Sequence, residues 1–252
     1  MSIVHCCAVG NGDMLSIRHN SENCTIIDCS ISDNDENWIL GEIDKQRDGK
    51  DITRFISTHP DQDHLMGLAA LDDHIEILNF YVVNNKATKE DESDDFKRYK
   101  KLRDGDKAFY IFEGCKRRWI NQFDEWRSSA GINIRWPVTS NKYFNEALEQ
   151  AADGKSPNNI SPVITYSCQN GVTMAWFGDL ETDFMDIVKQ AITWPSVDIP
   201  FAPHHGRDSG RNPRPILQDM DPKVVVIGEA PSKNLNYYGN YNTITQNKAG
   251  SI

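Results

Sequence analysis

The segment 58–64, with the sequence THPDQDH, places two imidazoles and two carboxylates within six residues. The apolar residues before it are typical of a buried strand, and its proline disfavours helix at the first histidine, which predicts a loop at a strand end. We expect His59 and Asp61 to serve one metal position, and Asp63 and His64 an adjacent one. The alternative is a polar loop that caps a helix, although capping requires only one such residue.

This pattern resembles the HxHxDH signature of the metallo-β-lactamase fold, with Asp61 in place of the second histidine. The form THPDxDH resembles the subgroup that contains the nuclease domain of the competence DNA-uptake protein ComEC. The resemblance extends over almost the whole chain. It implies an α/β fold, an αββα sandwich of two mixed β-sheets flanked by helices, and a hydrolase with two divalent metal ions.

Two later motifs resemble the same group. Gly178-Asp179 follows the apolar residues 174–177 and resembles the GD motif whose carboxylate bridges the two metals. A glycine here allows the backbone to approach closely. His204-His205-Gly206 resembles the HHG motif, which implies that His204 binds the second metal and that His205 lies beside the substrate.

The expected ligands combine three imidazoles with three carboxylates: His59, Asp61, Asp63, His64, Asp179 and His204. This oxygen-rich set favours Mn²⁺, with Zn²⁺ as the alternative. We expect Asp63 to orient the attacking hydroxide and His205 to protonate the leaving group as the catalytic residues. Many members of the fold supply a third histidine to the first metal, and none is found here, so occupancy of that position stays open.

Other motif residues have two interpretations each. Asp13 ends a turn that resembles the VGQGDA turn of the ComEC-like group, and it either holds the metal-binding loops or serves turn chemistry. Asp28 follows a strand, and it either supports the ligand loop without binding the metal, as the resemblance implies, or serves as a direct ligand. The segment 158–161 resembles the N-N-x-S segment, so Asn159 and Ser161 are expected to bind substrate or to form an ordinary turn.

The charge distribution is strongly segregated. The 252-residue chain has a net charge of -10 and a pI near 5.1, which argues against binding to a phosphate backbone. Within it, residues 97–118 carry a net charge of +6. We expect a charged insertion at about 85–136 that forms a lid over the metals, or else a helical face paired with the preceding acids. Arg207 and Arg211 suit an anionic substrate.

The remaining features place the chain in a broad class. We expect a single domain over residues 1–252. Six cysteines without paired spacing or a leader favour the reducing cytoplasm. No apolar run approaches the ~20 residues that span a bilayer. The last four residues are typical of the start of a strand, so the native chain is expected to extend further. A protein partner or a second copy of the chain stays open.

These inferences favour a metal-dependent phosphodiesterase, a nuclease that hydrolyses nucleic acid, with DNA as the favoured substrate. DNA processing or defence against phage would be its setting. One alternative is a hydrolase of a small ester, a lactone or a cyclic nucleotide. Another is a non-catalytic regulatory subunit of the same fold, since fold alone does not fix function.

Overall fold

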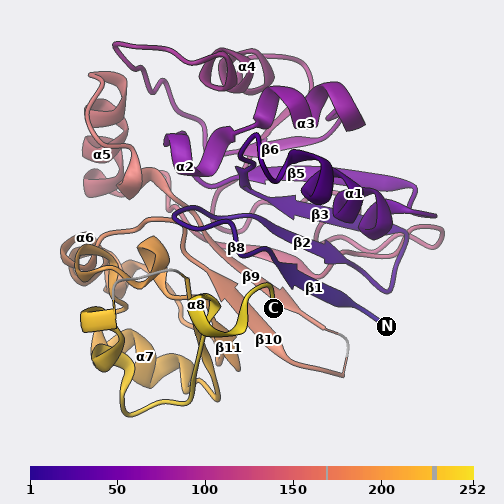
Figure 1. The fold of residues 1–252 in the computed structure, drawn as a ribbon. Coiled ribbons are helices and arrows are strands. Elements are labelled where there is room, and N and C mark those ends of the chain that lie inside the picture. The colour runs from indigo at the N-terminus through magenta and orange to yellow at the C-terminus, as the bar shows by residue number, and fades with distance from the viewer. Residues whose placement is uncertain (169, 229–231) are drawn as a thin grey trace.

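Two mixed β-sheets form the centre of the molecule, and helices cover them in an αββα sandwich (Figure 1). The computed structural model describes residues 1–168, 170–228 and 232–252. The first sheet has the order β1 (Ile3–Cys6), β2 (Leu15–Arg18), β3 (Asn23–Ile27), β5 (Ile52–Ser57), β6 (Phe80–Val82) and β7 (Ala108–Tyr110). The second has the order β11 (Ile199–Pro200), β10 (Thr173–Trp176), β9 (Val163–Ser167) and β8 (Ile132–Trp136). The predicted α/β sandwich is therefore confirmed.

Short strands and helices complete the layers. The strands β12 (Val225–Ile227) and β13 (Thr243–Thr245) pair in parallel, and β4 (Cys29–Ser30) follows β3. The helices are α1 (Glu36–Arg47), α2 (Gln62–Leu65), α3 (Leu68–Ile75), α4 (Asp94–Arg103), α5 (Lys142–Ala152), α6 (Thr182–Val188), α7 (Arg214–Met220) and α8 (Gln246–Ala249). None of the helices in the described part of the chain is long and apolar enough to cross a membrane.

The side chains of β5 alternate between two cores. Phe55 belongs to the buried cluster formed with α1, α3 and α4, whereas Ile56 belongs to the cluster shared with the second sheet. Successive side chains of a strand point to opposite faces, so this short apolar run fills both layers. The run is apolar throughout because both faces of a largely parallel sheet are covered.

The parallel strands β3, β5 and β6 end at the same edge of the first sheet. Ile27 pairs with Ile56, and Ile56 pairs with Tyr81. The Asp28 backbone N–H donates to the carbonyl of Ile56 at 3.0 Å. This register places Asp28 beside the start of the loop 58–64, and in such sheets ligand sites form outside the carboxyl ends of the strands.

The basic segment belongs to the first layer. Within it, α4 packs against α3 and β6, and β7 forms the edge strand of the first sheet. Four basic side chains of α4 pair with acids, in the ion pairs Lys97–Asp94, Arg98–Asp72, Lys100–Glu92 and Arg103–Asp104. For α4 this confirms the alternative of a helical face paired with acids.

The chain end differs from its predicted strand. Ala249 closes α8, whereas Ile252 exchanges two backbone hydrogen bonds with Cys6, of 2.8 and 3.0 Å. The last residue therefore extends the pairing of β1, the edge strand of the first sheet.

Phe80→Ala tests how the first layer is held together. Phe80 is fully buried, stacks on Phe55 at 5.7 Å between ring centroids and meets Tyr99 of α4 edge-on. We expect the free energy of unfolding to fall by about 3–5 kcal/mol, because removing this ring leaves a cavity. Urea denaturation measures the change. Phe123→Ala is the control, since Phe123 is 73% exposed, and a loss of equal size there would contradict the packing described.

Candidate metal centre

Several loops bring polar side chains together at one edge of the sandwich. The loop 58–64 follows β5, Asp179 follows β10, and the pair His204 and His205 follows β11 in the short 3₁₀ helix η3 (Pro203–Gly206). Asp13 reaches the same point from the hairpin between β1 and β2. All of these loops leave neighbouring strand ends, so their side chains converge although they are distant in sequence.

The carboxylate of Asp179 lies at the centre of the group and is 2% exposed. Its Oδ1 is 3.0 Å from His64 Nε2 and 3.8 Å from His205 Nε2. Its Oδ2 is 3.4 Å from His204 Nε2 and 3.8 Å from His59 Nε2. The two oxygens therefore face two different groups of imidazoles.

Two aspartates complete these groups. Asp61 Oδ2 lies 3.9 Å from His59 Nε2, and Asp63 Oδ2 lies 3.5 Å from His205 Nε2. We call the Oδ2 side, with His59 and Asp61, the first position. We call the Oδ1 side, with Asp63, His64 and His205, the second position.

The histidine pair is arranged differently from its predicted roles. The second position was assigned His204, and His205 was assigned to the leaving group. In the structure His205 is 2% exposed and faces Asp63 and Oδ1 of Asp179. The side chain of His204 is 12% exposed and lies against Oδ2 of Asp179 on the other side.

Unpaired buried atoms mark the space between these residues. Nε2 of His59 and of His205 are buried without a hydrogen-bond partner among the residues described, and Nε2 of His64 and Oδ1 of Asp179 face each other at 3.0 Å. One ligand atom each from Asp13, His64, Asp179 and His205 lies within 4.8 Å of the other three. Leaving such atoms unpaired is costly, and a metal ion would satisfy them together. The residues present therefore fit a divalent ion.

The electrostatic field of the group favours positive charge. Burial raises the pKa of Asp179, but the neighbouring imidazoles, His64 first, hold it well below its usual range. Burial also raises the pKa of Asp63, yet His205 and His64 lower it to about 2. For His205, burial lowers the pKa, and the carboxylates of Asp13 and Asp63 outweigh it and raise the pKa to about 10. A divalent ion would supply the same positive charge.

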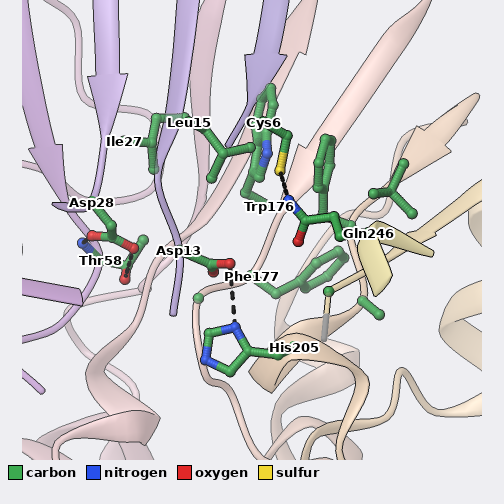
Figure 2. A pocket seen from close by; sticks show the side chains of 15 residues that line it. Cys6, Asp13, Leu15, Ile27, Asp28, Thr58, Trp176, Phe177, His205 and Gln246 are labelled. Carbon is green, nitrogen blue, oxygen red and sulfur yellow. Dashed lines mark hydrogen bonds and ion pairs between the residues drawn. The ribbon is translucent and has the colours of Figure 1, made fainter. Parts of the chain in front are cut away.

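Asp28 and Asp13 bind the Nδ1 atoms of two imidazoles, on the side of each ring opposite Nε2. Asp28 is buried and accepts from His64 Nδ1 at 2.9 Å, from the Thr58 backbone N–H at 2.7 Å and from its hydroxyl at 2.6 Å. Asp13 accepts from His205 Nδ1 at 3.3 Å (Figure 2). Such partners fix the tautomer and direct Nε2 forward. The turn resemblance pointed to Asp13, but nothing in the sequence separated this role from turn chemistry.

Strained backbone fixes the orientation of these loops. Asp28, His204 and His205 have positive φ angles, of 56°, 51° and 55°, which are rare for residues other than glycine. The His204 backbone N–H donates to the carbonyl of Gly178 at 2.9 Å. At Gly178 itself a Cβ would lie 2.8 Å from the Ser161 hydroxyl, so glycine is required where these loops touch.

The predicted substrate residues contact protein instead. The Ser161 hydroxyl accepts from the Asp179 backbone N–H at 3.3 Å, and Asn159 exchanges hydrogen bonds with Glu181. Both therefore position the Asp179 loop. Arg211 pairs with Asp208 and lies over the Tyr237 ring. Arg207 contacts the side chain of an expected ligand, with Nη1 3.3 Å from His204 Nε2.

The chain matches a known protein family. A family model described as the metallo-beta-lactamase superfamily matches residues 9–140, slightly more than half of the chain. A β-lactamase from Chitinophaga pinensis has a similar structure, with 13% identity and a TM-score of 0.44 over 80% of this chain and 78% of the other. A long form RNase Z from yeast has 10% identity and a TM-score of 0.41 over 88% of this chain, which spans only 37% of the RNase Z. No curated protein matches the sequence.

Asp28→Asn tests the support behind His64. The amide cannot accept the three hydrogen bonds that the carboxylate accepts, so the imidazole loses its fixed orientation. We expect affinity for Mn²⁺ or Zn²⁺ to fall by about 10–100-fold, as for other partners of metal-binding histidines. Isothermal titration calorimetry measures it, with the exposed Asp33→Asn as the control. Unchanged affinity in a folded Asp28 variant would contradict the role.

Proposed function

The chain belongs to the metallo-β-lactamase superfamily, whose members are mostly metal-dependent hydrolases, and from this premise we propose that it is a metal-dependent phosphodiesterase acting on nucleic acid. DNA is the favoured substrate, as the predicted ComEC-like motifs imply. The observation that carries the proposal is the arrangement of imidazoles and carboxylates around both oxygens of Asp179. The buried, unpaired Nε2 atoms of His59 and His205 are what a metal centre requires.

The second position has the stronger ligand set. Asp63, His64, His205 and Oδ1 of Asp179 would hold one ion there, with Asp13 and Asp28 fixing the rings. His59, Asp61 and Oδ2 of Asp179 would hold another at the first position, with His204 at its edge. Mixed imidazole and carboxylate ligands suit Mn²⁺ or Zn²⁺. A pair of such ions lowers the pKa of water and stabilises a leaving oxygen.

The partly exposed residues at the edge of the site, which we call the rim, are Asp63, His204 and Arg207. They would orient water and bind the substrate. The side chain of Asp63 is 27% exposed, so it is placed to orient the attacking water. His204 lies outward of His205, and its Nε2 accepts from Arg207 Nη1 at 3.3 Å, so His204 holds Arg207 at the edge of the first position. Arg207 beside it suits the phosphate oxygens, because a guanidinium binds them in a fork.

One observation favours a small substrate as a second candidate. Four of the five basic residues of α4, Lys97, Arg98, Lys100 and Arg103, are paired with acids, and the chain has a net charge of -10. These residues therefore contribute little to binding a long phosphate backbone. A hydrolase of a small ester, a lactone or a cyclic nucleotide requires only the residues at the rim.

Cleavage of labelled single- and double-stranded DNA and RNA tests the proposal. We expect cutting by the purified chain with Mn²⁺ or Zn²⁺, and none after chelation. Asp63→Ala should slow it by about 10²-fold or more, because this variant removes a ligand and the group that orients water. Asp33→Ala is the exposed control.

The outcomes separate the candidates. Equal cutting by wild type and the Asp63 variant would rule out the proposed centre. Hydrolysis of small diesters alone would favour the small-substrate candidate. Metal binding without turnover on any of these substrates would favour the non-catalytic subunit.

A further inference from the structure

Lys89 contacts the first position from the segment between β6 and α4. Its Nζ donates to Asp61 Oδ1 at 3.1 Å, and the two side chains are 25% and 32% exposed. The same Nζ lies 5.5 Å from the centroid of the Phe96 ring, and Phe96 is buried. An aromatic face attracts an ammonium group, so Phe96 helps to hold Lys89 at this carboxylate.

A second cation covers the other edge of the first position. Arg207 Nη1 lies 3.3 Å from His204 Nε2, and its Nη2 donates to the Asn11 side chain. The ring nitrogen that faces Oδ2 of Asp179 is therefore occupied by a guanidinium. Asp61 and His204, the least buried ligands of this side, each contact a positive side chain.

The second position has no such neighbour. Asp63 and Asp13 form ion pairs with His205 only, within the described ranges, and Asp179 pairs with histidines alone. The ligands on the two sides of the Asp179 carboxylate thus differ in their contacts with positively charged side chains. At one side the ligands are free of lysine and arginine, and at the other an ammonium already neutralises Asp61.

We propose that Lys89 controls loading of the first position: its ammonium neutralises Asp61 through Oδ1 and so weakens the binding of an ion at Oδ2, the oxygen that faces His59. The chain then binds its first ion at the second position and a further ion more weakly. This inference rests on the proposed metal centre, but it does not depend on nucleic acid as the substrate.

Lys89→Met in the full chain tests the inference without measuring activity. Methionine has an unbranched side chain one atom shorter than lysine, and it removes the charge. We expect two classes of Mn²⁺ site in the wild type, and about tenfold tighter binding to the weaker class in the variant. The tighter class should not change. Calorimetry gives the affinities, and electron paramagnetic resonance detects the spin-coupled Mn²⁺ pair at lower metal concentration in the variant.

Lys100→Met is the matched control. Lys100 Nζ lies 5.9 Å from the centroid of the same Phe96 ring but pairs with Glu92, so its loss should leave both affinities unchanged. Asp61→Asn provides a second variant, in which we expect the weaker class to be lost while the tighter class persists.

Three results would overturn the inference. They are equal affinities for two ions in the wild type, no change on replacing Lys89, and an equal effect from Lys100→Met. A folded wild-type chain that binds no ion would overturn the proposed function as well. Loss of DNA cleavage alone, with the Lys89 effect present, would support the inference and overturn only the nuclease proposal.

Discussion

The structure depends on a buried carboxylate that is surrounded by imidazoles. Asp179 is almost fully buried, and an isolated charge there would be strongly disfavoured. Imidazoles on both of its oxygens offset that cost, and other carboxylates hold those imidazoles in turn. Asp179 is stabilised by the imidazoles, and the imidazoles are stabilised by the other carboxylates. The loops that carry these groups therefore depend on one another for this arrangement.

The sheets make that convergence possible. The parallel register of β3, β5 and β6 aligns the strand ends from which Asp28 and the loop 58–64 leave. The second sheet brings Asp179 and the histidine pair to the same edge, and a backbone hydrogen bond from His204 to Gly178 joins their loops. The strained backbone at these residues is held by packing on both sides, as is common at functional sites.

Much of the fold and of the candidate site could be predicted from the sequence, because strands and motif loops are local features. Continuous apolar runs predict strands covered on both faces, and glycine before Asp179 marks a close approach of the backbone. The orientation of His204 and His205 is not local. Their positive φ angles decide which ring faces inward, and tertiary contacts set those angles. The pairing of the basic run is only partly local, since Asp94 and Glu92 precede it directly, whereas Asp72, the partner of Arg98, comes from α3.

Anomalous diffraction from crystals of the chain soaked in Mn²⁺ tests the central claim most directly. The account predicts the strongest peak between Asp179 Oδ1, His64 Nε2 and His205 Nε2, with a weaker peak or none beside Asp61. A strongest peak beside Asp61 and His59 would contradict the ranking of the two positions. Manganese bound only elsewhere on the molecule would contradict the metal centre itself.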